Sequence, residues 1–259
     1  MYKPSSRGAV GREIRAKGDA LSRSVTGFAA WPGNREAACY SAGDMTSLRL
    51  RVALGLAALL SAGAAYGQAT AAVDVMPDES LHGWTRIPIP PTDGLQPKMQ
   101  WRVDTAQHAL VCAGDGGHEW LRYDKELGDF ILQVDWRFTP RGPEEKKYNS
   151  GIGVRLSKYG EIWYQAQTGL SGGYLFGNNI VDGILASFNL SKQMRENRVK
   201  PAGEWNHYEV RAEGPRITLA VNDVVVSELP NCGLKRGYIG LEAEHYEVTF
   251  RNLKVQNLP

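Results

Sequence analysis

The stretch "DFILQVDWRF", Asp129 to Phe138, alternates between apolar and polar side chains. Its first residue, Asp129, and every second residue after it are polar apart from Ile131. The residues between them form one apolar face: Phe130, Leu132, Val134, Trp136 and Phe138. A period of two is typical of a β-strand with one buried and one exposed face. The stretch therefore predicts a strand of an antiparallel sheet.

The same period recurs towards the C-terminus. Residues 206–229, "NHYEVRAEGPRITLAVNDVVVSEL", predict three strands joined by a Gly-Pro turn and an Asn-Asp turn. In the last stretch, "YEVTFRNLKVQNL", the apolar positions keep one parity up to Phe250 and then change to Leu253 and Val255. One extra residue in a strand produces such a change, so we expect a β-bulge near Arg251 and Asn252.

These patterns predict an all-β protein with little helix, an antiparallel β-sandwich or jelly roll. Turn-forming clusters separate the apolar runs, and a long helical stripe is missing from the sequence. The candidate helix is short, around residues 187–197. We expect one domain over residues 75–259. Its core should include Trp136, Phe138, Val210, Leu219 and Phe250.

An export signal is expected before this domain. Residues 48–69, "LRLRVALGLAALLSAGAAYGQA", contain two arginines, a short apolar run and small residues, as a secretory signal peptide does. The run is shorter than the roughly 20 residues of a membrane span. We expect a signal over residues 45–67, cleaved near Gly67, and residues 1–44 to be an over-extended start or a disordered leader. The mature protein would be periplasmic or extracellular in a bacterium, and free of the membrane.

Charge and cysteine content narrow the function further. Residues 1–67 hold 9 of the 30 basic and 4 of the 28 acidic residues, which leaves a net charge of −3 on the rest. A basic surface for nucleic acid is therefore not expected. Cys112 and Cys232 lie in apolar surroundings, and the sequence leaves open whether they pair or stay free thiols. The oligomeric state is also open.

Three stretches carry polar residues that point to sugar chemistry. In "EIWYQAQ", a strand would place Glu161, Trp163, Gln165 and Gln167 on one face. An indole stacks on a sugar ring and amides pair with hydroxyl groups, although a plain polar outer face fits equally well.

In "NSGIGVRLSK", Ile152, Val154 and Leu156 should face the core, while Gly151, Gly153 and Arg155 face the other way. Two glycines on one face leave room for a group to approach the backbone. Asp135 and Arg137 of the neighbouring stretch add charges to a polar face. "LEAEHYE" contributes Glu242 and Glu244 on one face.

The chain also resembles a known family. The segments "LHGWTRI", "WRVDTAQHALVCAG", "EWLRYDKELGDFILQVDWRF", "NSGIGVRL", "WYQAQ", "PAGEWNHYEVRAEGPRITLAVND" and "GYIGLEAE…FRNLKV" occur here in the order typical of the 3-keto-disaccharide hydrolase family. That family is also described as 3-keto-glucoside 1,2-lyase/3-keto-2-hydroxyglucal hydratase. The resemblance covers residues 78–258. It implies an exported jelly roll of the concanavalin A-like kind that cleaves 3-keto glycosides by C2 deprotonation, elimination at C1 and rehydration.

Two departures from the family pattern concern the candidate site. The family commonly has Tyr-Glu-x-Gln where this chain has Tyr164-Gln165-Ala166-Gln167, and Gln-x-His where it has Glu242-Ala243-Glu244. The candidate catalytic residues are therefore Glu161, Glu242 and Glu244. The candidate substrate-binding residues are Asn149, Arg155, Trp163, Gln165, Gln167 and Arg137. The sequence identifies no cofactor and leaves a divalent metal ion open. The alternative function is a non-catalytic, lectin-like carbohydrate-binding module.

Overall fold

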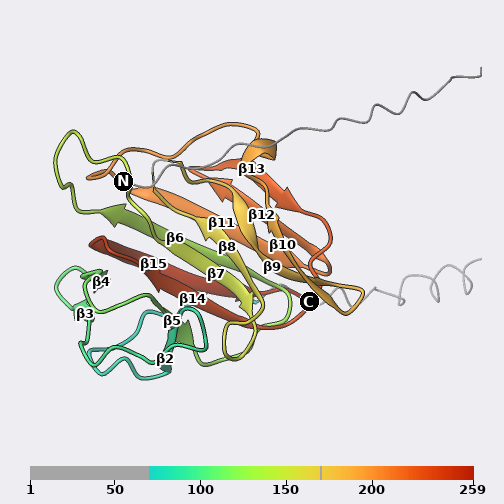
Figure 1. Ribbon diagram of the computed structural model, residues 1–259, viewed down its shortest axis with the longest axis horizontal. Coiled ribbons are helices and arrows are strands. Elements are labelled where there is room, and N and C mark those ends of the chain that lie inside the picture. The colour runs from blue at the N-terminus through green and yellow to red at the C-terminus, as the bar shows by residue number, and fades with distance from the viewer. Residues whose placement is uncertain (1–69, 170) are drawn as a thin grey trace, which may run out of the picture. The chain divides into compact units, whose positions relative to one another are not determined.

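Two antiparallel sheets face each other across one apolar core (Figure 1). The computed structural model describes residues 70–169 and 171–259, so the expectations for residues 1–44 and 45–67 lie outside the described part of the chain. Strands β6 (Phe130–Phe138) and β14 (Tyr238–Ala243), one from each sheet, run in similar directions in Figure 1, as in an aligned sandwich. The predicted all-β jelly-roll class is confirmed.

The first sheet has eight strands, in the order β13-β12-β11-β6-β15-β4-β3, with β1 paired to β15. Their bounds are β1 Val73–Asp74, β3 Trp101–Asp104, β4 Ala109–Cys112, β6 Phe130–Phe138, β11 Asn206–Glu213, β12 Arg216–Val221, β13 Val224–Leu229 and β15 Val248–Asn257. We call this sheet A.

The second sheet, sheet B, has seven strands in the order β10-β9-β8-β7-β14-β5-β2. Their bounds are β2 Trp84–Pro88, β5 Glu119–Tyr123, β7 Gly151–Leu156, β8 Trp163–Gln167, β9 Leu175–Val181, β10 Ile184–Asn189 and β14 Tyr238–Ala243. The chain passes between the sheets several times, so residues far apart in the sequence become neighbours in sheet B.

Strand β6 lies in the middle of sheet A, between β11 and β15, and its alternation is as predicted. Trp136 is 1% exposed and Phe138 is 2% exposed, while Val210, Leu219 and Phe250 are fully buried. Burial of each such side chain contributes on the order of 1.5–3 kcal/mol to folding. The five predicted core residues are therefore confirmed.

The predicted bulge in the last strand is present. The register of β15 against β6 shifts between Arg251 and Lys254, and Asn252 has φ of +51°. Asparagine tolerates this left-handed conformation better than most residues. Because the bulge restores the inward direction, Leu253 is fully buried and Val255 is 4% exposed.

Strand β7 contradicts the sequence pattern at its C-terminal end. Arg155 has φ of +47°, and the ladder between β7 and β14 shifts register at this point. The left-handed residue reverses the alternation, so Arg155 turns inward and Leu156 turns out to pack against Ile87 and Trp120 on the outer face. The predicted inward Leu156 and outward Arg155 are both wrong.

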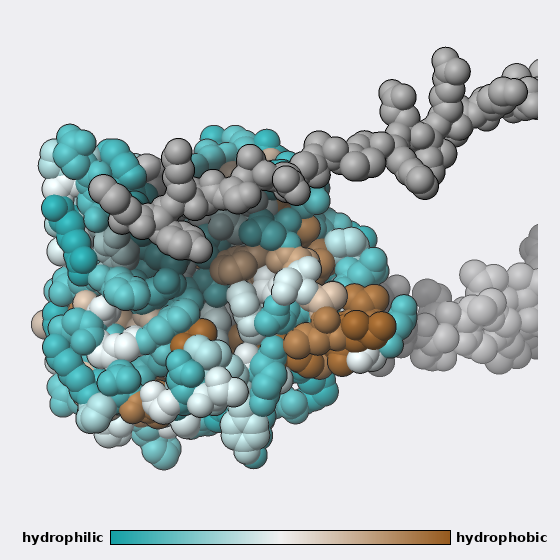
Figure 2. All heavy atoms as spheres, in the orientation of Figure 1, coloured by the Kyte–Doolittle hydropathy of each residue, from teal (hydrophilic) through white to brown (hydrophobic). Residues whose placement is uncertain are grey.

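The predicted helix around residues 187–197 is also wrong. Ser187 to Asn189 belong to β10, and a single 3-10 turn, η1, covers Ser191–Gln193. Strand β10 is a sheet edge, and Val181 at the end of β9 and Ile184 and Leu185 at the start of β10 are exposed. Strands β9 and β10 lie towards the right of Figure 1, and Figure 2 shows a brown patch on that side. In the described residues no helix has the length and apolarity to cross a membrane.

Candidate active site

A cavity of about 470 Å³ opens on the outer face of sheet B. Strand β8 supplies part of its floor because its side chains alternate: Tyr164 and Ala166 are in the core, and Trp163, Gln165 and Gln167 line the cavity. Strand β14 brings Glu242, with Glu244 just after it, and β5 brings Trp120. The segment Ile89 to Pro91 lies along one side.

The side chain of Gln165 passes over Gly151, which has no side chain, and reaches the carboxylate of Glu242. Its Nε2 lies 2.7 Å from Glu242 Oε2 and 3.2 Å from Gln167 Oε1. A Cβ on Gly151 would lie 1.9 Å from that same Nε2. The space above this glycine is therefore filled by the chain's own amide, which fixes one oxygen of Glu242.

Gly153 serves a second close approach. A Cβ there would lie 2.8 Å from Leu156 Cδ2 and 3.1 Å from Trp120 Cζ3. The two glycines that the sequence singled out thus make room for side chains of this chain rather than for a ligand. Gln165 and Trp120 are held in position as a result.

His118 lies between the two carboxylates of β14. Its Nε2 is 2.8 Å from Glu242 Oε1 and 3.8 Å from Glu244 Oε2. Glu242 is 4% exposed, and burial, together with the charge of Glu244, raises the pKa of this carboxyl although the hydrogen bond from His118 opposes the change. Burial acts to lower the pKa of His118, but the hydrogen bond and charge of Glu242 and the charge of Glu244 raise it overall. The pair therefore retains a proton more readily than either group in water.

Glu244 is the more accessible carboxylate, with 26% of its side chain exposed against 6% for Glu242. Asn149 Nδ2 donates to Glu244 Oε2 at 2.5 Å. Asn149 in turn accepts a hydrogen bond from Gln167. A chain of amides therefore holds Glu244 at the cavity surface and leaves its other oxygen available.

Three sequence candidates have different places. Glu161 lines the rim of the cavity, but it lies in the turn before β8, is exposed, and accepts a hydrogen bond from Ser157 Oγ at 2.6 Å. Arg155 is wrong as a sugar ligand because it is buried inside the sandwich and paired with Asp129 at 2.7 Å. Arg137 is wrong for the same site because it lies on sheet A, with its guanidinium 4.5 Å from the centre of the Trp205 ring.

Two important residues were missed by the sequence reasoning, His118 and Trp120. Neither is among the sequence candidates, although their spacing of two places them on one face of the strand that Glu119 begins. That signal was available from the sequence. Their proximity to β14 was not, because the pairing Trp120 with Glu242 joins residues 122 positions apart.

His118, Glu242 and Glu244 form the one candidate cation site found in the described part of the chain. The potential ligand atoms of His118, Glu242 and Glu244 all lie within 4.8 Å of one another. One imidazole and two carboxylates suit a divalent ion such as Zn²⁺ or Mn²⁺. In the structure their polar atoms already bond to each other and to neighbouring amides.

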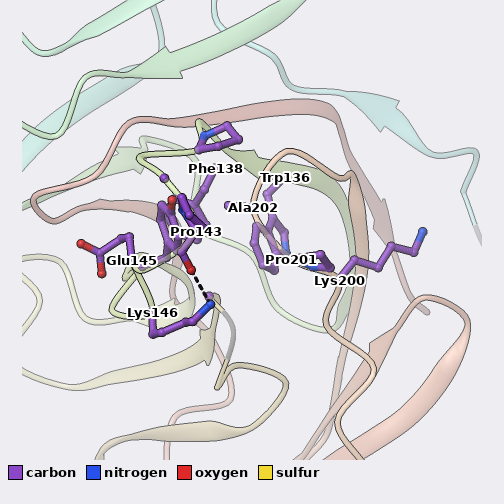
Figure 3. Close-up of a pocket in the computed structure, with 12 residues that line it drawn as sticks. Trp136, Phe138, Pro143, Glu145, Lys146, Lys200, Pro201 and Ala202 are labelled. Atoms are coloured by element: carbon purple, nitrogen blue, oxygen red, sulfur yellow. Dashed lines mark hydrogen bonds between the residues drawn. The ribbon is translucent and has the colours of Figure 1, made fainter.

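A second cavity, of about 420 Å³, opens near the end of β6 (Figure 3). Trp136, Phe138 and Pro201 face it, and it is mainly apolar. Figure 3 shows Glu145 and Lys200 extending away from it, while Lys146 Nζ donates to the Pro143 carbonyl at 2.7 Å. Its titratable groups are thus not brought together, and the cavity on sheet B is the better candidate for chemistry.

Solved structures share the fold at low sequence identity. A putative glycosyl hydrolase from Parabacteroides distasonis aligns with a TM-score of 0.51 and 14% identity over 73% of this chain and 94% of its own. The carbohydrate-binding module CBM66 from Bacillus subtilis gives 0.50 and 15% over 68% and 96%. LamAcat from Zobellia galactanivorans gives 0.50 and 11% over 75% and 99%. No curated protein matches the chain by sequence.

The family is shown by the sequence itself. Residues 71–256 match the family model described as a 3-keto-alpha-glucoside-1,2-lyase-like domain. The match spans the whole sandwich, from β1 to the last residues of β15. The resemblance inferred from the sequence is confirmed, and it associates the chain with carbohydrate chemistry. The chain belongs to the 3-keto-alpha-glucoside-1,2-lyase-like domain family.

Proposed function

We propose that the protein is an exported enzyme that cleaves 3-keto glycosides. The observation that carries the proposal is the arrangement of His118, Glu242 and Glu244 in one cavity, with two carboxylates of unequal burial around one imidazole. Pairs of titratable groups in different environments are the usual basis of acid and base roles. The family match supports a 3-keto glycoside as the substrate class.

The first step is removal of the proton at C2 of the sugar. The neighbouring ketone at C3 acidifies this proton, because the electron pair left behind forms an enolate. Glu244 is the best base, since it is at the cavity surface with one oxygen held by Asn149. Glu161 is the weaker candidate, because its carboxylate lies on the exposed rim and is bonded to Ser157.

The second step expels the substituent at C1. The enolate re-forms the C3 carbonyl, a double bond forms between C1 and C2, and the C1–O bond breaks with its electron pair on the leaving oxygen. His118 and Glu242 share a retained proton and would supply it to that oxygen. Water then adds at C1 and a proton returns to C2, so the overall result is hydrolysis.

Polar side chains of the cavity would hold the sugar during these steps. Asn149 and Gln167 line the cavity next to Glu244, where their remaining hydrogen-bonding capacity can pair with sugar hydroxyls. Gln165 has a different part in the proposal, because its Nε2 already donates to both Glu242 and Gln167. It positions Glu242 rather than binding the substrate directly.

A divalent ion is a second way of assisting the leaving oxygen. His118, Glu242 and Glu244 would hold it, and it would act as a Lewis acid. Activity that is lost on chelation and restored by Mn²⁺ or Zn²⁺ would favour this version. Activity that chelators leave unchanged would favour the proton carried by His118 and Glu242.

A conservative substitution tests the central role. Glu244→Gln keeps the size and the bond to Asn149 but removes the base. We expect turnover of a 3-keto glucoside to fall at least about a hundredfold, as for loss of a general base, while binding changes little. Glu161→Gln is the matched control and should retain most activity. Equal activity of Glu244→Gln and the wild type would refute the assignment.

The substrate and the isotope content of the product test the mechanism itself. A 3-keto glycoside should be cleaved while its unoxidised parent is not, and the C2 hydrogen should exchange with solvent deuterium during turnover. Retention of the C2 hydrogen would exclude C2 deprotonation. Binding of sugars without any turnover would instead favour the lectin-like module, for which Glu244→Gln should have little effect.

Export is proposed on the strength of the N-terminal sequence. If residues 45–67 act as a signal peptide, the secreted protein begins within a few residues of Gln68. Mass spectrometry of the protein recovered from the periplasm or medium measures this directly. A mature N-terminus near Met1 would contradict the expectation.

A further inference from the structure

The cavity on sheet B has two chemically different ends. The polar end contains His118, Glu242, Glu244 and the amides of Gln167 and Asn149. We call the other end the aromatic end; it is formed by Trp120, Trp163, Phe176 and the segment Ile89 to Pro91. A ligand that fills both ends must therefore carry a polar part and an apolar part.

The rings of the aromatic end form a continuous surface. The Trp120 and Trp163 ring centres are 6.5 Å apart, and those of Trp163 and Phe176 are 5.1 Å apart at 88°. Trp120 is 2% exposed, and it packs with Ile87 and Leu156 beneath it, which fixes its ring. Trp163 and Phe176 are half-buried, so a ligand can still cover them.

The segment Ile89 to Pro91 closes the aromatic end on the opposite side. It is tied to the polar end, because the Ile89 N–H donates to the His118 carbonyl at 3.0 Å. A Cβ placed on Gly160 would lie 3.6 Å from Trp120 Cδ1 and 4.0 Å from Pro91 Cγ, so the three residues converge. The aromatic end is thus bounded by rings and prolines.

Hydrogen-bonding side chains are few at this end: besides the indole N–H groups, the lining offers the side chains of Asn178 and Glu161, and one oxygen of each is already bonded within the protein. Asn178 Oδ1 accepts from the Ser187 hydroxyl at 2.8 Å, and Glu161 accepts from Ser157. A second sugar ring would bring several hydroxyl groups here. Each hydroxyl buried without a partner costs about 1–3 kcal/mol, whereas a flat apolar group costs nothing of this kind.

We infer that the glycosides recognised by this cavity carry an aromatic aglycone rather than a second sugar. The inference rests on the proposed function, since it assigns the polar end to the 3-keto sugar. The aglycone would lie against Trp163 and Phe176. A phenolate is also a weaker base than a sugar alkoxide, so it departs from C1 with less help from an acid.

Binding, rather than turnover, separates this inference from the proposed function. The 2-naphthyl 3-keto-glucoside and the matching 3-keto disaccharide are titrated in both anomeric forms against the wild-type protein, with calorimetry as the readout. The titration uses Glu244→Gln if either ligand is cleaved. We expect the naphthyl compound to bind at least about tenfold more tightly, the range of one or two aromatic contacts.

Variants identify the surface responsible. Trp163→Ala should reduce the preference for the naphthyl ligand to about threefold or less and leave the affinity for the disaccharide nearly unchanged. Phe176→Leu should act in the same direction if Trp163→Ala does not fold. Trp205→Ala, which removes the tryptophan just before β11 that packs against Arg251 of sheet A, is the matched control and should keep the preference.

Equal or tighter binding of the disaccharide would overturn the inference, as would an equal loss of both ligands in Trp163→Ala. Either result leaves the proposed reaction standing. Conversely, a clear preference for the naphthyl ligand without cleavage of any 3-keto glycoside would retain the aromatic site and refute the enzyme.

Discussion

Arg155 is a fully buried cation inside a β-sandwich. Its Nη2 lies 2.7 Å from Asp129 Oδ1, and its Nη1 donates to the carbonyls of Gly214 at 2.6 Å and Leu234 at 3.0 Å. Asp129 also accepts from the Gly214 N–H at 3.0 Å. These bonds connect the start of β6 with the loops after β11 and β13, so one side chain fastens three segments at this end of the core.

Loss of this cation should destabilise the protein. Removal of one partner of a buried ion pair costs on the order of 3–5 kcal/mol, and Arg155→Met should be near the lower value because 29% of the Asp129 side chain is exposed. Urea unfolding measures the change. Arg137→Met, the control on the outer face of sheet A, should change stability by about 1 kcal/mol or less. Similar effects of the two substitutions would show that the pair contributes little.

The pH dependence of stability should reveal the proton shared by His118 and Glu242. The folded state raises the pKa of His118 above the 6.5 of an unperturbed histidine, so the imidazolium contribution is complete below that pH and is lost as pH rises through the raised pKa. The raised pKa of Glu242 acts in the same direction, from 4.5 upwards.

Urea unfolding at a series of pH values tests this expectation. The wild-type free energy of unfolding should fall more steeply above pH 6.5 than that of His118→Gln. The catalytic rate should fall over the same alkaline range if the shared proton assists the leaving oxygen. Identical pH profiles of the two proteins would exclude a proton held at His118.

At the scale of single residues, the sequence predicted the features that depend only on neighbouring residues in the chain. The alternation of Gln165 and Gln167 with Tyr164 and Ala166 depends on neighbouring residues alone, and it was predicted. Arg155 was misplaced because its own left-handed backbone conformation reverses the alternation of the strand. Arginine is not a residue type that favours this conformation, so the sequence did not indicate it. In Asn252 the same conformation was detectable, because apolar residues of changed parity follow it.

At the level of elements, β7 contributes to the site through two positions that have no side chain. Gly151 and Gly153 leave the outer surface of the strand bare, and Gln165 of β8 and Trp120 of β5 use the space. Gln165 from β8 crosses over Gly151 to Glu242 of β14. The strand itself therefore contributes no side chain to this contact, but it sets the distance across which the contact forms.

Filling that space should damage the site more than the fold. In Gly151→Ala, the added methyl group would displace Gln165 from Glu242, since three atoms of the Gln165 side chain lie within 2.5 Å of the new carbon. We expect activity to fall at least about tenfold, which corresponds to one lost positioning hydrogen bond to a charged group. Gly94→Ala adds a methyl group in open space and is the control.

Activity and melting temperature are measured together on both variants. The expected result is a loss of activity in Gly151→Ala that exceeds any loss in Gly94→Ala, with the folded state preserved in both. Full activity of Gly151→Ala would show that the bond from Gln165 to Glu242 is not needed.

Element order across the sheets was beyond the reach of the sequence. Strands β6, β11 and β12 follow from alternation, but the position of β14 between β5 and β7 does not. That position is what brings His118 to Glu242 and Glu244. A histidine with no partner in its own stretch therefore looked like an ordinary edge residue, and the acid and base groups could be proposed only in part.

For the molecule as a whole, the described cysteines are buried free thiols rather than a disulfide. Cys112 lies in β4 of sheet A, and burial raises its pKa to about 12. Cys232 lies in the segment between β13 and β14, where its thiol donates to the Leu234 carbonyl at 2.8 Å. Burial shields both thiols from oxidants, and the raised pKa of Cys112 also leaves that thiol with little of the reactive thiolate form.

Alkylation with and without denaturant tests this protection. In the unreduced native protein, neither Cys112 nor Cys232 should react with iodoacetamide within the time that labels a small-molecule thiol completely. Both should react after unfolding in guanidinium chloride, and peptide mass spectrometry assigns the label to each residue. A peptide pair linked through these two cysteines would contradict the structure.

The alternation of β8 has a consequence for how such a protein can change. Tyr164 and Ala166 belong to the core, while the residues that alternate with them line the cavity. One face of this short strand is therefore constrained by folding and the other by ligand binding. Substitutions on the ligand side leave the packed interior untouched. A combinatorial library restricted to positions 163, 165, 167, 242 and 244 should consequently contain a high proportion of folded members, and its members can differ in chemistry while sharing one architecture.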